Sequence, residues 1–237
     1  MARNIFKNNL QPTRFDTAIF LFSRSAAEES VLKPLSKQPK HANRTIASHL
    51  INHVQQIAKS AGLPVFWMDE KKQHGVGFGD RFSNAFEQMF ALGFDCVISI
   101  GNDCPALTTA DLVLAARKLD VFNAVFGPAT DGGVYLIGLR HEVFNAEKFA
   151  CLKWQTDQVL SDLESYVSGD FFLLSEKSDI DSTADLLRLL QGYSIPVLLK
   201  IRLLNAVTPT LSNRVNNSVF VPSPAYIPGF ALRGPPK

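Results

Sequence analysis

Short apolar runs alternate along the chain with longer stretches in which apolar residues recur at every third or fourth position. The short runs are rich in β-branched and aromatic residues and predict buried strands, because a strand covered on both faces reads as a continuous apolar run. Six strands are expected, at Thr17–Phe22, Pro64–Met68, Asp95–Ile100, Val121–Phe126, Val134–Leu139 and Phe171–Leu174.

The longer stretches predict amphipathic helices. In the first of them Ile46, Leu50, Val54 and Ile57 are three or four residues apart, and Gly62 follows. Two others open with Thr or Ser and have Asp three residues later, which is the spacing of a capping box. The predicted helices are Asn43–Ala61, Asp80–Leu92, Thr108–Leu119, Gln155–Val167 and Ser182–Leu190.

Strands that alternate with helices imply right-handed crossovers and an α/β fold of three layers, with a mostly parallel sheet and helices on both of its faces. Two segments depart from this pattern. Ser23–His41 is polar and contains two prolines, so we expect a loop that folds over another part of the molecule. Asn205–Lys237 is rich in Pro, Ser and Thr. We expect it to be an irregular arm, lying on the body or reaching the neighbouring subunit of a homodimer, or else a disordered tail. The domain boundaries that follow are an N-terminal extension at 1–14, one domain at 15–204 and the C-terminal arm at 205–237.

Composition narrows the class of protein. The 237 residues are 46% hydrophobic and 19% charged, which is typical of a globular domain with a buried core. The 24 basic and 22 acidic residues nearly cancel, so no basic surface for nucleic acid is indicated. No apolar run reaches the roughly 18 residues of a membrane span, and the first residues do not form a signal peptide. Three separated cysteines are typical of reduced thiols. We therefore expect a cytoplasmic protein.

Candidate chemistry lies in the loops that follow the strands. In an open parallel sheet, ligands bind beyond the carboxyl ends of the strands. The loops Ser23–Lys33, Gly101–Pro105 and Gly127–Gly133 should therefore open on one edge. The first of them contains two cations, Arg24 and Lys33, that could bind phosphate.

Asp103 follows a buried strand and precedes a proline in a short, stiff loop. Its carboxylate suits Mg²⁺ or Mn²⁺, which prefer oxygen ligands and would neutralise charge on a diphosphate. The alternative is a turn residue whose carboxylate accepts backbone N–H groups. Asp181 could supply a second metal ligand, or it could instead favour the N-terminal dipole of the helix that follows it.

Asp131, Gly132 and Gly133 lie between two predicted strands. Adjacent glycines permit positive φ and a close approach of a ligand to the backbone, so this loop could line a substrate site. Asp-Gly is also the usual hairpin dipeptide, and a plain hairpin turn is the alternative. Because Asp103 follows the preceding strand, the two loops together favour a functional site over a plain hairpin turn.

Two further features are weaker. The glycine-rich segment 75–79 precedes a predicted helix on whose first turn Arg81 lies, where it could bind a phosphate or remain on the surface. His49 and His53 are four residues apart, a spacing that can chelate zinc, but no third ligand is evident and a solvated helix face is favoured.

These motifs, in their order and spacing, resemble a bacterial family (DUF2064, formerly a domain of unknown function) of proposed glycosyltransferases related to nucleotide-diphospho-sugar transferases. The likeness runs from about Phe15 to Leu190. The motifs that carry it are Phe78–Phe82, Gly101–Pro105, Gly127–Leu139, Trp154–Asp157 and Asp179–Asp185.

The resemblance implies a glycosyltransferase A-type fold, a Rossmann-like sheet that binds a nucleoside diphosphate at its switch point. It also implies that Asp103 is the metal-binding Asp of that fold's DxD-like position. The first loop departs from the family pattern Phe-Ala-Lys-Ala-Pro-x-Pro-Gly and Lys-Thr-Arg-Leu. Here Arg24 stands for the first Lys and Lys33 for the second, while Glu28 and Glu29 would repel phosphate.

The leading hypothesis is a glycosyltransferase that depends on Mg²⁺ or Mn²⁺ and uses a nucleotide-sugar donor with an acceptor of unknown identity. In it Asp103 and Asp181 hold the metal, while Arg24, Lys33 and Arg81 neutralise phosphate. Asp131 is then the catalytic base beside the substrate loop of Gly132 and Gly133. The alternatives are nucleotidyl transfer from a nucleoside triphosphate and a non-catalytic binding protein with an altered donor loop.

Overall fold

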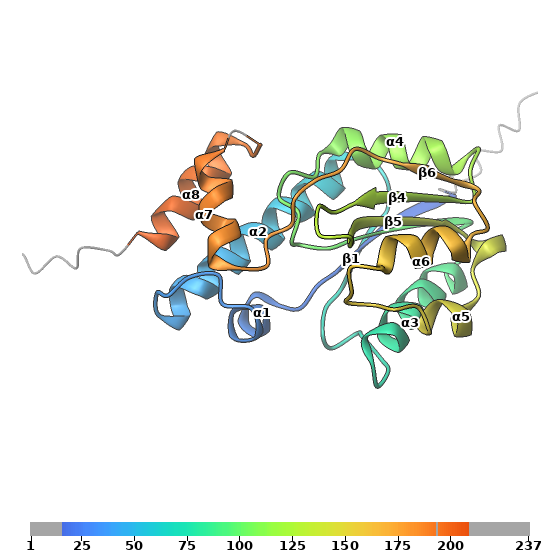
Figure 1. Ribbon diagram of the computed structural model, residues 1–237, viewed down its shortest axis with the longest axis horizontal. Helices are drawn as coiled ribbons and strands as arrows, with labels where there is room; N and C mark the ends of the chain where they lie inside the picture. The colour runs from blue at the N-terminus through green and yellow to red at the C-terminus, as the bar shows by residue number, and fades with distance from the viewer. Residues whose placement is uncertain (1–15, 193, 209–237) are drawn as a thin grey trace, which may run out of the picture.

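The protein is built around a six-stranded sheet, which occupies the middle of the right-hand part of Figure 1. The computed structural model describes residues 16–192 and 194–208. The six predicted strands are confirmed, with shifts of up to three residues at their ends. They are β1 (Thr17–Phe22), β2 (Val65–Met68), β3 (Cys96–Ile100), β4 (Ala124–Pro128), β5 (Val134–Arg140) and β6 (Phe171–Leu173).

The strand order is β2-β1-β3-β5-β4-β6, and the predicted mostly parallel sheet is confirmed. The pairs β1–β2, β1–β3 and β4–β6 are parallel, whereas β5 runs antiparallel to both of its neighbours. The direction of β5 follows from the short connection after β4, because a parallel crossover needs a dozen or more residues. β5 therefore enters the sheet at the edge where β1, β3 and β4 end.

All five predicted helices are present, and three more are found that the sequence pattern did not predict, α1, α5 and α8. The helices of the described chain are α1 (Ala26–Leu32), α2 (Lys40–Ser60), α3 (Phe78–Ala91), α4 (Thr109–Leu119), α5 (Ala146–Ala150), α6 (Val159–Tyr166), α7 (Thr183–Gln191) and α8 (Val197–Val207), with a 3₁₀ turn η1 at His141–Val143. Both predicted capping boxes cap their helices through Thr108 and Ser182.

Side chains that alternate along the strands divide the core between two faces of the sheet. In β1, Ile19 and Leu21 pack with residues of α2 and α4. Phe20, between them, packs on the other face with Phe82 of α3 and Phe149 of α5. The sheet is thus covered by helices on both faces, which confirms the predicted three-layer α/β/α fold.

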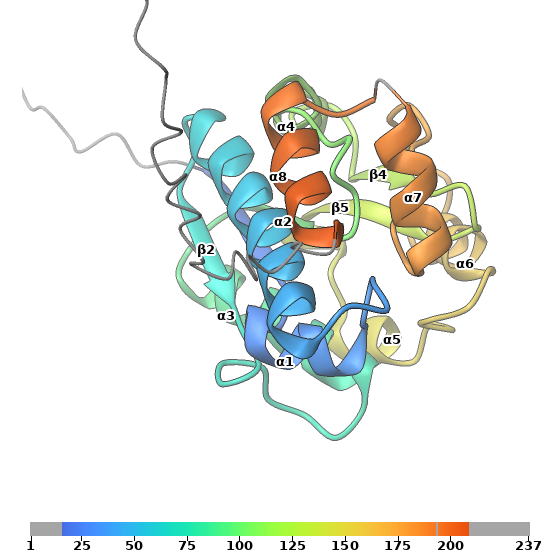
Figure 2. The ribbon, with the colours of Figure 1, turned by 90° about the vertical axis from the view of Figure 1, so that its left-hand side faces the viewer.

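A third apolar cluster lies away from the sheet, at the left of Figure 1 and facing the viewer in Figure 2. There α7 and α8 pack against the first half of α2, with Leu186, Leu199 and Leu203 buried against Leu50. The expected C-terminal arm begins within α8, whose last residue is Val207. The N-terminal extension, and the rest of the arm with its expected dimer contact, lie outside the described residues.

Two expectations about local structure are corrected. The segment Ser23–His41 is not wholly a loop, because Ser25 caps the two-turn helix α1 and accepts a hydrogen bond from the Glu28 N–H. The helix expected from Gln155 begins only at Val159, since Gln155 has a φ of 62° and cannot continue a right-handed helix. Within the described residues, no helix is long and apolar enough to cross a bilayer.

Candidate active site

The carboxyl ends of β1, β3 and β4 open on one edge of the sheet, as predicted, and a pocket of about 500 Å³ lies there. Strand ends form its floor, with Ser99 and Ile100 of β3 and Tyr135 of β5 among the lining residues. The segments 154–157 and 179–181 close its sides. A single pocket therefore collects residues from segments that are more than 150 positions apart in sequence.

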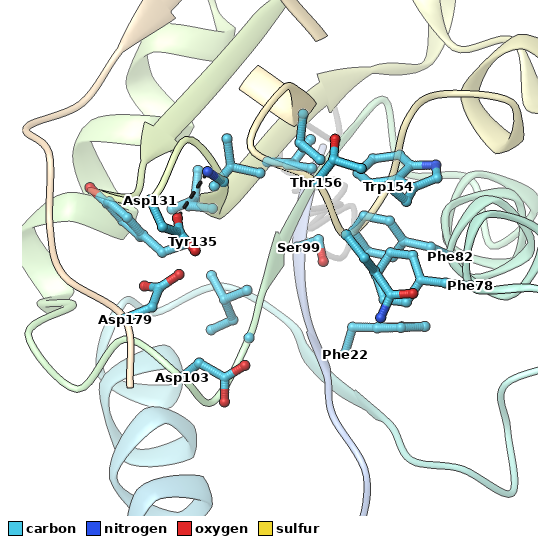
Figure 3. A pocket seen from close by; sticks show the side chains of 18 of the residues that line it. Phe22, Phe78, Phe82, Ser99, Asp103, Asp131, Tyr135, Trp154, Thr156 and Asp179 are labelled. Atoms are coloured by element: carbon cyan, nitrogen blue, oxygen red, sulfur yellow. Dashed lines mark hydrogen bonds between the residues drawn. The ribbon is translucent and has the colours of Figure 1, made fainter. Parts of the chain in front are cut away.

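Two walls of contrasting chemistry face one another across this pocket (Figure 3). The first, called here the carboxylate wall, consists of Asp103, Asp131, Asp179 and Asp181. The second, the aromatic wall, consists of Phe22, Phe78, Phe82 and Trp154. The pocket can thus accept a molecule that has a flat apolar part at one end. At its other end the molecule would carry an anionic part, which binds beside the carboxylates through cations.

The aromatic wall is a packed array of rings. Phe82 has ring centroids of Phe22, Phe78 and Trp154 at 4.8, 5.5 and 5.1 Å. The indole N–H of Trp154 donates to the Phe149 carbonyl at 2.8 Å, so its hydrogen bond is made inside the protein. These rings offer a ligand apolar faces and edges rather than polar groups.

Lys33, expected to bind phosphate, instead joins the two aspartates expected to bind metal. Its Nζ lies 3.1 Å from Asp103 Oδ1 and 2.6 Å from Asp181 Oδ1. Burial lowers the pKa of Lys33, but the two carboxylates outweigh this effect and the net pKa is raised. Burial likewise raises the pKa of Asp103, against the lowering effect of Lys33. The three residues form one charged cluster beside the pocket.

Arg24, the other expected phosphate-binding cation, is also engaged with a carboxylate. Its Nη1 lies 3.4 Å from Oε2 of Glu29, whose pKa is raised mainly by burial. Glu29 therefore offsets the charge of Arg24, rather than standing in the pocket to repel a phosphate. Neither Arg24 nor Lys33 is among the residues that line the pocket itself.

The loop between β4 and β5 is a hairpin connection whose tip lines the pocket. Asp131 Oδ1 accepts a hydrogen bond from the Gly133 N–H at 2.9 Å, and both residues line the pocket. Gly132 has a φ of 88°, and a Cβ there would overlap the backbone of Asp157. At Gly132 the group that approaches the glycine backbone closely is therefore the 154–157 segment of the protein, where the sequence suggested a ligand. Gly132 shapes the pocket from outside its lining.

Arg81 lies apart from the pocket lining. Its Nη1 donates to the Val76 carbonyl at 3.3 Å, on the exposed segment before α3. At the N-terminus of that helix, Asp80 Oδ2 accepts a hydrogen bond from the Gly77 N–H at 3.2 Å. A carboxylate of the protein already caps this end of α3.

Asp179 is a member of the carboxylate wall that the sequence pattern did not single out. Its Oδ1 is buried and, within the described part of the chain, has no hydrogen-bond partner. Burial, followed by the charges of Asp103, Asp131 and Asp181, raises its pKa to about 7. A signal existed in Asp179-Ile180-Asp181, because alternate residues of an extended segment point to the same side. Ile180 is buried, and both aspartates line the pocket.

His53 supports the loop that carries Asp103. Its Nε2 is 3.0 Å from the carbonyl oxygen of Pro105, so a ring N–H can donate to it. Burial lowers the pKa of this histidine, although the same hydrogen bond opposes the effect. The contact ties α2 to the loop between β3 and α4.

The donor set of the carboxylate wall fits a hard divalent cation. Asp103 and Asp181 direct one oxygen each at a common point, where Lys33 lies, and elsewhere in the same pocket Asp179 has a buried oxygen without a hydrogen-bond partner among the described residues. In the described chain no three His, Cys, Asp or Glu side chains converge on one point. Mg²⁺ and Mn²⁺ are nevertheless commonly held by one or two carboxylates plus substrate phosphates and water. The two aspartates would hold such an ion once Lys33 withdrew.

Comparisons with solved structures show which fold this is. A proposed nucleotide-diphospho-sugar transferase from Desulfovibrio desulfuricans G20 is similar, with a TM-score of 0.66 at 19% identity, over 82% of this chain and 97% of that one. Rv0371c from Mycobacterium tuberculosis H37Rv, in complex with manganese, has a TM-score of 0.46 at 14% identity, over 74% and 98% of the two chains. A cytidylyltransferase from Leptospira borgpetersenii has a TM-score of 0.40 at 11% identity, over 83% and 98%. The first match shows a shared fold, and the other two are too distant to support an argument.

Family models give a match in sequence as well. No curated protein matches the chain significantly. Residues 49–156 match the family described as uncharacterized protein conserved in bacteria (DUF2064). This segment includes the loops of Asp103 and Asp131, while the 179–185 motif lies beyond it. The resemblance to this family, predicted from the loop motifs, is confirmed from within α2 to the 154–157 segment.

Proposed function

We propose that this protein is a metal-dependent glycosyltransferase that takes a sugar from a nucleotide-sugar donor. The observation that carries the proposal is the cluster of Lys33, Asp103 and Asp181 at the carboxyl edge of the sheet. It combines a lysine, which we propose to bind phosphate, with a carboxylate pair in the place where α/β sheets bind nucleotides. The aromatic wall opposite supplies a surface for a base or sugar ring.

The two walls suggest how the donor is oriented. A nucleobase stacks on aromatic rings through its π face, while the diphosphate requires positive charge. We place the base against Phe22, Phe78 and Trp154, and the diphosphate toward Lys33 and the carboxylate pair. A divalent ion held by Asp103 and Asp181 would neutralise charge on the diphosphate as it leaves. Arg24 and Arg81 could reach phosphate only by leaving Glu29 and the Val76 carbonyl.

The acceptor side is assigned to the hairpin loop. In glycosyl transfer the bond from the anomeric carbon to the diphosphate oxygen breaks, and a bond to the acceptor oxygen forms. The acceptor loses a proton, which a positioned carboxylate can take as general base. Asp131 holds the Gly133 N–H through Oδ1, so Oδ2 is the oxygen that we assign to this proton. Gly132 and Gly133 fix the loop that presents it.

Thermal unfolding with a panel of nucleotides and nucleotide-sugars, with and without Mn²⁺, tests the proposal. A ligand at about 100 times its Kd stabilises the folded state by about 2.7 kcal/mol, which raises Tm by several degrees. We expect this shift only when Mn²⁺ and nucleotide are both present, and we expect Asp103→Ala to abolish it. Asp170→Ala is a suitable control, because Asp170 is exposed and precedes β6 at the opposite edge of the sheet.

Two results would contradict the proposal. If no nucleotide stabilises the protein under any condition, the non-catalytic alternative replaces it. If turnover releases pyrophosphate from a nucleoside triphosphate rather than a nucleoside diphosphate from a nucleotide-sugar, the reaction is nucleotidyl transfer. Both reactions use the same edge of the sheet, so product analysis is the measurement that separates them.

A further inference from the structure

Lys33 places its ammonium group between two carboxylates from distant segments, one after β3 and one before α7. The side chain of Lys33 is 18% exposed, whereas those of Asp103 and Asp181 are 40% and 60% exposed. The Lys33 side chain is therefore the least exposed of the three. Its position, between two oxygens at 2.6 and 3.1 Å, is where a small cation would bind to the same pair.

The carboxylate pair is held together by backbone contacts that do not involve Lys33. The Ile180 N–H donates to the Asp103 carbonyl oxygen at 2.8 Å, which joins the two loops directly. The Asp181 N–H lies 3.3 Å from Asp185 Oδ2, in the cap of α7. The backbone thus brings two like charges together, and these repel unless a cation lies between them. Any cation of suitable size and charge could fill that place.

Lys33 can leave the pair without a rearrangement of the fold. It is the C-terminal cap of α1, and its N–H donates to the Glu29 carbonyl oxygen at 2.8 Å. Its backbone is therefore fixed, while its four-carbon side chain can rotate. The ammonium can swing from the carboxylates to a nearby phosphate with α1 in place.

We propose that Lys33 and a divalent cation compete for the single position between Asp103 and Asp181. Lys33 fills it in the empty protein. Mg²⁺ or Mn²⁺ displaces the ammonium, which then becomes available to the phosphates of the donor. This inference rests on the metal site of the proposed function and adds to it the identity of the resident cation that the metal must replace.

The exchange makes nucleotide binding depend on metal. With Lys33 on the aspartates, its charge is already neutralised and the carboxylate wall opposes an anionic diphosphate. After exchange, the position holds two positive charges instead of one, and the released ammonium adds another near the phosphates. The protein would then bind the metal and the diphosphate together far better than either alone.

Titration of Mn²⁺ into the protein without nucleotide, followed by the EPR signal of free Mn²⁺, tests the exchange. Lys33→Met removes the ammonium and keeps a side chain of similar length. We expect it to tighten Mn²⁺ binding roughly tenfold, because the pair loses its competing cation. Lys177→Met is the matched control, since Lys177 is equally enclosed and pairs with Asp111 instead. It should change Mn²⁺ affinity much less. Adding Asp181→Asn to Lys33→Met should remove the gain.

A second measurement uses the unaltered protein. Acylation of lysines followed by mass spectrometry should find Lys33 protected in the empty protein and more reactive when Mn²⁺ is bound, while Lys177 does not change. Unchanged or weaker Mn²⁺ binding by Lys33→Met would overturn the exchange, as would no Mn²⁺ binding by either protein. Tighter Mn²⁺ binding by Lys33→Met without any nucleotide binding would instead support the exchange and overturn the proposed function.

Discussion

The aromatic wall of the pocket is an extension of the core, whereas the carboxylate wall is carried by loops. Phe82 is 6% exposed and packs against Phe20, Phe86 and Phe149, so the rings that face the pocket are fixed by the rings behind them. The carboxylates of Asp103, Asp131, Asp179 and Asp181 lie instead on segments between regular elements. The aromatic wall is held in place by burial, whereas the carboxylate wall is held in place by the backbone of its loops.

This contrast has a consequence for stability. Burial of the aromatic wall favours folding, because apolar surface leaves water. In the carboxylate wall Lys33 offsets the charges of Asp103 and Asp181. The charged form of Asp179 nevertheless opposes folding, because this group is near the other aspartates and has a buried oxygen without a partner in the described structure. Truncation of a ring in the aromatic wall should therefore destabilise the protein, and removal of the Asp179 charge should stabilise it, while changes in either wall should weaken ligand binding.

Phe82→Ala should have the largest effect on stability. The side chain is nearly fully buried at the centre of the ring cluster, and truncation of such a residue costs about 3–5 kcal/mol. Urea unfolding of the variant and of Phe78→Ala, whose ring is only partly buried, would measure the difference. A larger loss for Phe78→Ala than for Phe82→Ala would show that the aromatic wall is not an extension of the core.

Gly132→Ala should have the next largest effect, and it tests the backbone of the loop that carries Asp131 of the carboxylate wall. An alanine there must adopt a positive φ and also overlap the backbone of Asp157, so we expect a loss of about 2–3 kcal/mol. Gly169→Ala is a matched control, because Gly169 has a φ of 86° but no atom within 4 Å of the added Cβ. It should lose only about 1 kcal/mol, the cost of the backbone conformation. Equal losses would mean that the contact with the 154–157 segment does not shape the pocket.

The sequence predicts the aromatic wall's scaffold better than it predicts the charged contacts. Strands and capped helices depend on local periodicity, so all six strands and the caps at Thr108 and Ser182 could be located. The sequence pattern does not predict α1, although Ser25 and Glu28 have capping-box spacing, because the prolines and charges around this helix are typical of a loop. The antiparallel direction of β5 can also be predicted from the sequence, since the connection after β4 is too short for a crossover.

The pairing of Lys33 with Asp103 and Asp181 could not be predicted in the same way. These residues lie 70 and 148 positions apart from Lys33, and no periodic pattern relates them. Their contact depends on strand order and on the backbone bond between Ile180 and Asp103. From the sequence, the positions of these residues relative to the strand ends predict only that all three lie at one edge of the sheet. Which of them meet is decided by the path of the chain between β6 and α7.

Of the three substitutions, Asp179→Asn should change the free energy of unfolding least. It should increase this free energy, whereas Phe82→Ala and Gly132→Ala should decrease it. In the folded protein the pKa of Asp179 is raised from 3.8 to about 7, so its charged form is disfavoured by folding. Its contribution to stability is fully present below pH 4 and is lost as the pH rises through about 7. At pH 8 the uncharged asparagine should therefore increase the free energy of unfolding by about 1–2 kcal/mol, since solvent at the open pocket screens part of the repulsion.

The pH dependence of that gain is the sharper measurement. Urea unfolding of both proteins at pH 4.5 and pH 8 should give a larger difference at the higher pH, because the other carboxyl groups are common to both. Asp170→Asn is the control for the same substitution at an exposed position, at the opposite edge of the sheet from the pocket. A gain for Asp179→Asn that is equal at both pH values would mean that neither burial nor the neighbouring aspartates disfavour the charged form of this carboxyl group. A loss at pH 8 would mean that the carboxylate wall is stabilised by charge and that its contrast with the aromatic wall is wrong.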